Sequence, residues 1–487
     1  MRTRCFAIAA GLLVLAACNF DILNTNQPTQ GDLLGNPTRD KLTAAATGVM
    51  SSARSGMVSL IWRLGSMGRE GINLSGNNQP DYSEPYFGPV QSGGSFGGTQ
   101  WLDRFQSIRT ANLYLQALAN NVNLIGPDKL SDAERAAGRG MANTYKALAF
   151  LYVIETRAQL GAPVDVDRTV AQGPAPWVTE DSVYGYIIGL LNSAATDLAT
   201  ADSTPFPFSI PPGLAAFSLP VDFIKFNRAL AAKANVLRAT ALAGCHGTPA
   251  TCYADALTAL GQSFLNPTPA AFQNAANLDF STAPGDQTND LSEPLDGATF
   301  FALTDNIADA DTQTNGSKDQ RVLSKIDSAQ VVQILGGISI PGELKFTIYL
   351  TNGSADANHP IPFIKDEELV LLRSEASWFT GAKAQAVADL NLVRQNSGLL
   401  PPSTVTAAST DAAFITALLY ERRFSLLWEQ GTRWIDARRF GLLSTIPLDV
   451  TGGNIPEAMP VPSPECDARN LPTKTIGDLI TCTPLSP

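Results

Sequence analysis

One stretch of the 487-residue chain, Glu421 to Gly441 (ERRFSLLWEQGTRWIDARRFG), mixes charged and aromatic residues so closely that it limits how the surrounding chain can fold. Its pattern predicts a helix that begins near Asp411, stops at Gln430–Gly431, and is followed by a second short helical turn. Asp411 could cap the start of that helix, and Gly431 suits the left-handed conformation found at helix ends. The stretch should therefore form two helices joined by a tight turn.

The arginines of this stretch should be partly buried, stacked on aromatic rings and paired with acids. Arg433, Asp436 and Arg439 are three residues apart, which would give an alternating ion ladder on one face of the second turn. We interpret the stretch as a structural clamp, and a catalytic or ligand-binding role for its charges is the alternative. The clamp comprises Arg422, Trp428, Glu429, Arg433, Trp434, Asp436, Arg438 and Arg439.

The N-terminus predicts how the chain is targeted. Arg2 and Arg4 precede an apolar run of about a dozen residues, which fits a secretory signal peptide over residues 1–17 and is too short for a membrane span. The run ends in Leu-Ala-Ala-Cys, the pattern of a bacterial lipobox, so we expect acylation (palmitate) at Cys18. An ordinary signal peptide followed by a chance cysteine is the alternative.

Residues 18–36 are polar and predict a tether between the lipid and a single folded domain, residues 37–487. Asn19 follows the acylated cysteine; an aspartate there would indicate retention in the inner membrane, so we expect the outer membrane. No later segment has 18 or more uninterrupted apolar residues. The mature chain should therefore be anchored to the membrane by its lipid and not span it.

The net charge of −11 argues against one class of partner. An acidic surface repels phosphate backbones, so we expect no nucleic-acid partner. Neutral or cationic ligands suit such a surface better than anionic polymers.

Four cysteines remain once Cys5 has left with the signal peptide and Cys18 has been acylated. Close pairs of cysteines outside the cytoplasm predict disulfides. The alternative is a zinc site that uses His246, but the chain has two histidines and no C-x-x-C spacing, so we expect no metal and no cofactor. The predicted disulfides are Cys245–Cys252 and Cys466–Cys482.

Apolar residues recur at helical spacing over most of the chain. Ser131 followed by Glu134 is a capping box, which predicts that a long helix begins there. Alanine-rich helices in pairs are typical of tetratricopeptide-like repeats, so we expect a mostly α fold with about four such pairs. Helices are expected at 38–54, 101–120, 131–160, 179–199, 227–243, 365–379, 382–396 and 411–429.

The repeat helices should thus occupy about residues 101–260 and 361–441, with an irregular region of loops and strands at about 262–360. Within that region, alternating β-branched residues at 331–350 predict a small β-hairpin.

Residues 72–100 have no helical or strand periodicity, and an irregular segment of that length is often functional. Its aromatic rings and its amide and carboxylate side chains are the groups that bind sugars by stacking and hydrogen bonding. The alternative is a surface loop whose aromatics pack back onto the body. The candidate ligand-binding residues are Asn78, Asp81, Tyr82, Tyr86 and Trp101.

Several stretches together resemble the SusD/RagB family of outer-membrane nutrient-binding lipoproteins. Residues 422–441 resemble the family's ending of arginine, glutamate, Gly-x-Arg-Trp and Asp-x-Arg-Arg, and residues 361–399 resemble its penultimate helix pair. Ser317–Arg321 and Lys345 resemble its Asp-x-Arg motif and lysine-containing strand. The segment Leu160–Pro163 departs from the family's Tyr-Gly-Asp-x-Pro because it lacks the aspartate.

The resemblance implies a scaffold of helix-pair repeats whose irregular loops hold the ligand. It also implies a location on the outer face of the outer membrane, where such proteins cap a SusC-like TonB-dependent barrel. The expected function is to bind a glycan or other oligomeric nutrient and hand it to that barrel for import. The partners implied are therefore the barrel and an oligosaccharide.

Two other functions stay open. A protein-interaction scaffold would recruit partners through its helical repeats and hold no small ligand. A carboxylate-pair glycosidase would need two positioned acids. The chain has no G-x-S-x-G, H-E-x-x-H or P-loop motif, so we expect no enzyme activity.

Overall fold

The computed structural model describes residues 29–487 except 77–78, 89, 93–95, 336, 470–473, 477–478 and 482–487. The expected signal peptide, Cys18, Asn78 and Cys482 therefore lie outside the described residues. Within the described part, no helix is both long and apolar enough to cross a bilayer.

The fold is mostly helical, as expected. The first half of the chain forms α2 (Gln30–Gly35), α3 (Arg39–Ser52), α4 (Met57–Met67), α5 (Pro80–Phe87), α6 (Thr99–Asn120), α7 (Asp132–Arg157), α8 (Glu180–Ala201), α9 (Pro220–Ala239), α10 (Gly244–Gly247) and α11 (Pro249–Gly261). The second half forms α12 (Asp305–Ala308), α13 (Gln320–Lys325), α14 (Asp366–Phe379), α15 (Lys383–Asn396), α16 (Asp411–Ser425), α17 (Thr432–Arg439) and α18 (Ser463–Ala468).

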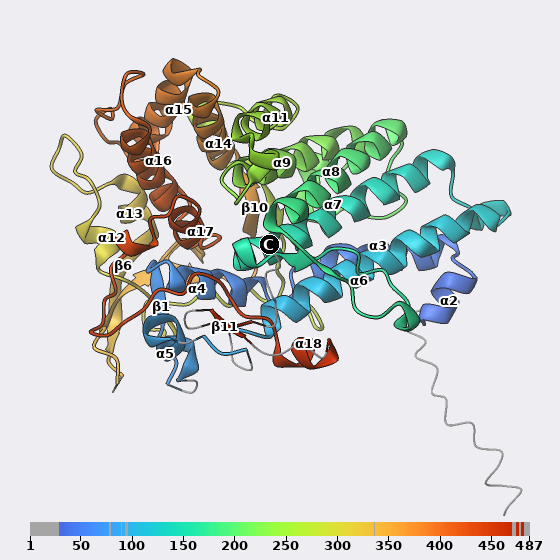
Figure 1. Ribbon diagram of the computed structural model, residues 1–487, viewed down its shortest axis with the longest axis horizontal. Helices are drawn as coiled ribbons and strands as arrows, with labels where there is room; N and C mark the ends of the chain where they lie inside the picture. Colours follow the sequence, from blue (N-terminus) through green and yellow to red (C-terminus); the bar gives the residue numbers. More distant parts are fainter. Residues whose placement is uncertain are drawn as a thin grey trace, which may run out of the picture.

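The long helices pack on one another in chain order. Helix α6 lies between α3 and α7, α8 packs on both α7 and α9, and α11 joins α9 to α14. Helix α14 in turn contacts α15 and α16, so the row continues across the irregular region of the sequence. Figure 1 shows these helices as a curved row, which is the arrangement expected of tetratricopeptide-like pairs.

Helix α7 begins where the capping box predicts. The Ser131 hydroxyl accepts from the Glu134 amide at 3.2 Å, and the Glu134 carboxylate accepts from the Ser131 amide at 2.8 Å. The same carboxylate binds the Arg39 guanidinium through two hydrogen bonds of 2.6 and 3.1 Å. This hydrogen-bonded ion pair lowers the pKa of Glu134 to about 2. One acid thus caps α7 and ties it to α3.

The strands are short. They are β1 (Gly71–Asn73), β2 (Ala162–Pro163), β3 (Trp177–Val178), β4 (Ala275–Leu278), β5 (Phe300–Ala302), β6 (Ile326–Gln333), β7 (Gly342–Phe346), β8 (Leu350–Thr351), β9 (Ser354–Ala355), β10 (Ile361–Lys365), β11 (Lys474–Ile476) and β12 (Leu479–Thr481). The expected hairpin is present as the antiparallel pair β6–β7. It belongs to a four-stranded sheet in the order β1-β5-β7-β6, which the sequence did not predict.

Two local predictions need correction. Thr410, not Asp411, caps α16: its hydroxyl accepts from the Ala413 amide at 3.2 Å. The Asp411 carboxylate instead accepts from the Trp378 indole at 2.8 Å, so it bonds to a residue of α14 and not to an amide of its own helix. Gly431 is left-handed as predicted (φ 63°), but it precedes α17, because α16 already ends at Ser425.

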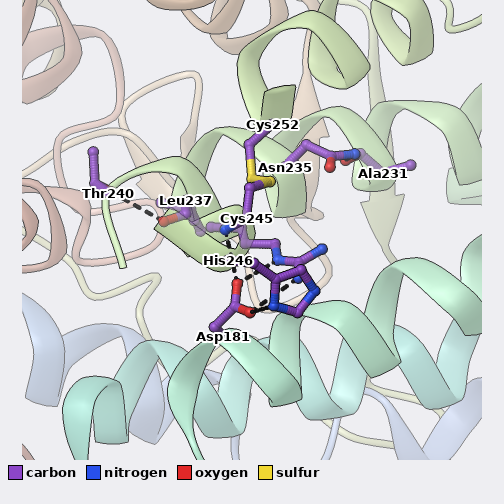
Figure 2. Close-up of a disulfide and its surroundings, with 9 residues drawn as sticks. Asp181, Ala231, Asn235, Leu237, Thr240, Cys245, His246 and Cys252 are labelled. Atoms are coloured by element: carbon purple, nitrogen blue, oxygen red, sulfur yellow. Dashed lines mark hydrogen bonds and ion pairs between the residues drawn. A yellow bond between two sulfur atoms is a disulfide. The ribbon is translucent and has the colours of Figure 1, made fainter. Parts of the chain in front are cut away.

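The Cys245–Cys252 disulfide is present and joins α10 to α11, with Cα atoms 5.9 Å apart (Figure 2). Cys245 has a left-handed backbone (φ 49°), and its amide donates to Asp181 on α8 at 2.9 Å. The His246 ring lies 3.4 Å from the same carboxylate. Cys466 is buried, and its expected bond to Cys482 stays a prediction because Cys482 is not described.

Asp366, the first residue of α14, predicts a pH-dependent stability. Its carboxylate is fully buried, accepts from the Asn266 amide at 2.6 Å, and has its other oxygen unpaired. Burial raises its pKa to about 7. The stability contributed by the protonated form is therefore complete below the unfolded pKa of about 4 and is lost as the pH rises through 7.

Asp366→Asn should remove this component, because an amide can accept the Asn266 bond at any pH. Urea unfolding at pH 5 and pH 8 should show that the variant loses less stability over this interval than the wild-type protein. Parallel losses in the two proteins would contradict the assignment.

Candidate functional site

Five of the eight residues of the predicted clamp are buried, Arg433, Arg438 and Arg439 are partly buried, and both acids of the clamp are paired with basic side chains. Asp436 lies between two guanidinium groups: Arg422 donates to it at 2.7 Å and Arg439 at 2.8 Å. Burial raises the pKa of Asp436, but the two arginines outweigh it and lower the pKa overall. Arg439 also binds the Glu375 carboxylate on α14 through hydrogen bonds of 2.5 and 2.6 Å. The cluster joins α14, α16 and α17.

Arg433 is not a rung of the expected ladder. Its guanidinium donates to the Arg69 carbonyl at 2.9 Å, and its amide donates to Glu70 at 3.2 Å. Glu70 also accepts from the Trp428 amide at 2.8 Å, and burial raises its pKa. The Glu70 carboxylate therefore accepts from one amide in the turn between α16 and α17 and from one amide in the first turn of α17. Only the Asp436–Arg439 half of the ladder forms.

Glu429 takes part in a second cluster at the end of α16. Lys325 and Lys365 donate to the same Glu429 oxygen at 3.0 and 2.7 Å, and both also donate to the Ser425 carbonyl. Positive charge at a helix C-terminus satisfies carbonyls that have no partner within the helix. The cluster borders a polar cavity of about 510 Å³. Because its lysines already use their donors, it has the character of a structural cap.

The residues predicted to bind ligand were expected in an exposed irregular loop, but the described ones lie on helices and are buried. Residues 80–87 form α5, and its Tyr86 is fully buried beneath Arg69, 4.0 Å from its ring. Asp81, Tyr82 and Trp101 are each 9 % exposed or less. Trp101 packs on Phe105, with ring centroids 4.4 Å apart. The burial of these four side chains argues against direct contact with a ligand. Their ligand-binding role stays a prediction. Asn78 lies outside the described residues.

The structure offers a different pocket, which we call the Tyr145 pocket. It has a volume of about 310 Å³, at the lower end of the range typical of small-ligand sites. It lies where α3, α7, β4 and β10 meet, together with the loop that precedes the short 3-10 helix Pro212–Phe217. The residues that define it are Met50, Arg54, Tyr145, Ile210, Asn277, Leu278, Asp279, Asp286 and Phe363.

The floor of the Tyr145 pocket is aromatic and apolar. The rings of Tyr145 and Phe363 meet edge to face with centroids 6.1 Å apart, and both side chains are almost fully buried. Such a floor can pack against the apolar face of a sugar ring. Neither the Tyr145 hydroxyl nor the side-chain amide of Asn277 has a hydrogen-bond partner among the described residues, so both are available to a ligand. Burial raises the pKa of Tyr145, so the hydroxyl stays protonated and can donate.

The charged groups at the pocket already hold protein partners. Arg54 lies 2.7 Å from the Asp286 carboxylate and donates to the Asp279 carbonyl at 2.9 Å. The Asp279 carboxylate accepts from the Gly213 amide at 2.7 Å. A backbone bond from Gln287, with help from Arg54, lowers the pKa of Asp286. Both carboxylates therefore already bind protein donors. The groups that stay free are the Tyr145 hydroxyl and the Asn277 side-chain amide, which suit the hydroxyls of a neutral ligand.

No sequence signal pointed to this pocket. Tyr145 falls on an apolar helical stripe and would be assigned to the core, while Asn277 and Asp279 lie in the irregular region. Arg54 lies just beyond the end of α3. These residues come together only because β4 pairs with β10 beside α7 and α3.

Comparisons with known proteins identify the fold. No protein-family model matches the chain, and no curated protein sequence matches it. Many solved structures are similar to this chain, and three of them are described here. A SusD superfamily protein from Bacteroides thetaiotaomicron is 15 % identical, with a TM-score of 0.62 over 89 % of this chain and 98 % of that one.

A laminarin-binding SusD-like protein is 17 % identical, with a TM-score of 0.61 over 88 % of this chain and 97 % of that one. A SusD-like carbohydrate-binding protein from Bacteroides fragilis is 14 % identical, with a TM-score of 0.61 over 85 % of this chain and 88 % of that one. At these identities the likeness concerns the fold. It confirms the SusD-like fold expected from the sequence.

Proposed function

We propose that this chain, with its SusD-like fold, binds a neutral glycan in the Tyr145 pocket. The observation that carries the proposal is that the Tyr145 hydroxyl and the Asn277 side-chain amide are free, in a pocket whose floor is formed by the rings of Tyr145 and Phe363. Two proteins of the same fold are described as binding laminarin or carbohydrate. The pocket volume of about 310 Å³ suits about one or two sugar units, so the rest of an oligomer would lie outside it.

The proposal extends to where the protein acts. Acyl chains on Cys18 would hold the protein on the outer membrane, facing outward. A SusC-like TonB-dependent barrel would then receive the bound oligomer for import. The lipobox and the polar tether support this part of the proposal. Copurification of the mature lipoprotein with a single large β-barrel would test it, and recovery of the lipoprotein alone from mild detergent would contradict it.

The protein should bind without turning its ligand over. Asp279 and Asp286 are the carboxylates that line the Tyr145 pocket, and each already binds a donor of the protein. A glycosidase needs one acid free to protonate the leaving group and a second carboxylate to act as base or nucleophile. Release of reducing sugar from a bound glycan, abolished by Asp279→Asn, would overturn this part of the proposal.

Tyr145→Phe tests the pocket itself. Calorimetric titration with laminarin, amylose and polygalacturonate (an acidic comparison) should show binding to a neutral glycan. The variant should weaken it about five-fold, since one lost hydrogen bond costs about 1 kcal/mol. Tyr114→Phe is a matched control: the Tyr114 hydroxyl is also unpaired, but it is buried and does not line the pocket.

Equal affinity in the Tyr145→Phe and wild-type proteins would place the glycan elsewhere. Binding of none of the three polysaccharides by the wild-type protein would contradict the glycan proposal and favour the protein-interaction scaffold.

A further inference from the structure

A second hollow lies along helix α6, and we call it the α6 cleft. Its volume is about 460 Å³. One wall is formed by residues of α6 at helical spacing, and the other by the loop around Val166–Thr169. The residues on which the inference depends are Phe105, Arg109, Asn112, Gln116, Val166 and Asp167.

Asn112 at the base of the α6 cleft is the unusual feature. The residue is only 6 % exposed and its side-chain amide has no hydrogen-bond partner among the described residues, but the amide atoms are not fully buried and can be reached from the cleft. The Asn112 side chain can therefore offer both a donor and an acceptor to a ligand in the cleft.

The surrounding walls are held in place before any ligand arrives. Phe105 is half-buried, fixed between the rings of Trp101 at 4.4 Å and Phe150 at 6.2 Å. On the opposite wall, both Asp167 carboxylate oxygens accept from the Gln116 amide, at 2.9 and 3.1 Å. A preformed site avoids the entropy cost of ordering its side chains on binding.

The α6 cleft has no net charge, which suits a neutral ligand: the Asp167 carboxylate offsets the Arg109 guanidinium, and Asp165 offsets Arg168. Asp167 is bound to Gln116, and Arg168 lies 2.8 Å from Asp165. Arg109 is exposed and has no ion-pair partner among the described residues, so it is free to donate to hydroxyls. The cleft therefore combines donors of Arg109, the amide of Asn112 and the ring of Phe105, which match the hydroxyls and the apolar face of a sugar.

We propose that the α6 cleft is a second saccharide-binding subsite, which takes a neutral sugar unit through Asn112 and Arg109 with Phe105 beneath its ring. The inference rests on the proposed glycan-binding function and adds a site to it. The subsite is separate from the Tyr145 pocket. Ser107, which donates to the Ser52 carbonyl of α3 at 2.8 Å, lies on the opposite side of α6 from Asn112 and Gln116 at 100° per residue.

Asn112→Leu tests the subsite with a combination of results that a structural asparagine would not give. Leucine keeps the volume and breaks no hydrogen bond to the described residues, so the melting temperature should stay close to that of the wild-type protein. Affinity for the neutral glycan bound by the wild-type protein, laminarin or amylose, should fall about five-fold with the loss of about one hydrogen bond. Titration and thermal unfolding would use the mature lipidated protein in detergent.

Asn121→Leu is the matched control. Asn121 is also buried, but its side chain bonds to the Pro37 and Asp128 carbonyls and to the Leu130 amide at 2.8 to 2.9 Å. This control should melt at a lower temperature and, in its folded fraction, keep the wild-type affinity. A matching fall in the melting temperature of Asn112→Leu would show a structural amide and overturn the inference.

Other outcomes distinguish failure of the second subsite from failure of the proposed glycan-binding function. Unchanged affinity in Asn112→Leu, with weakened affinity in Tyr145→Phe, would overturn the second subsite and leave the proposed function standing. Binding of neither glucan by the wild-type protein would overturn the proposed function, and the second subsite with it. Preference of the α6 cleft for polygalacturonate, lost in Asn112→Leu, would overturn the assignment of a neutral ligand.

Discussion

Gly431→Ala is expected to destabilise the protein by about 2 to 5 kcal/mol, the sum of two separate costs. The first is the left-handed backbone at this position (φ 63°), which costs an L-residue with a Cβ about 1 to 2 kcal/mol. The second is steric, because a Cβ at Gly431 would overlap the Cβ of Leu64 and lie 2.9 Å from the Leu64 carbonyl carbon. Overpacking of this kind costs about 1 to 3 kcal/mol.

Gly441→Ala separates the two costs. Gly441 is also left-handed (φ 68°), but no atom lies within 4 Å of where its Cβ would be. It should therefore lose only the backbone contribution, about 1 to 2 kcal/mol, in urea unfolding. Equal losses in the two variants would show that α4 and the turn before α17 separate at little cost, and would contradict the close approach of Leu64.

Trp434→Ala is expected to lower the free energy of unfolding by about 3 to 5 kcal/mol, as for other buried aromatic residues truncated to alanine. Trp434 is fully buried, its indole donates to the Pro456 carbonyl at 2.8 Å, and the Arg438 guanidinium lies 4.2 Å from its ring. The variant would lose the packing and the hydrogen bond together, and it would leave a cavity. Thermal and urea unfolding would measure the loss.

Glycan affinity of the folded Trp434→Ala fraction should stay close to that of the wild-type protein, because Trp434 lines neither the Tyr145 pocket nor the α6 cleft. Trp434→Phe is the graded control: it keeps most of the packing and removes the bond to Pro456, so it should lose about 1 to 3 kcal/mol. A large loss of glycan affinity at unchanged stability would instead indicate that the clamp residues take part in ligand binding.

The sequence predicted well whatever depends on residues a few positions apart. The capping box of Ser131 and Glu134 and the helical periodicities need only neighbours on one turn, so their elements formed where expected. The left-handed Gly431 and the short-range Cys245–Cys252 disulfide are of the same kind. The resemblance of the closing stretch added the fold, which the solved structures confirm.

The tertiary structure decided which partner each buried polar group takes. Asp411 bonds to Trp378 instead of capping its own helix, and Glu70 binds amides at residues 428 and 433. Several groups compete for each donor or acceptor, and the choice depends on which distant elements pack together. The free Tyr145 hydroxyl and the free Asn112 amide follow from the same packing, because an unpaired polar group is identified only when every neighbour is in place. The sequence by itself therefore determined most of the long helices, and only the tertiary structure determined the partners within the closing clamp and where a ligand can bind.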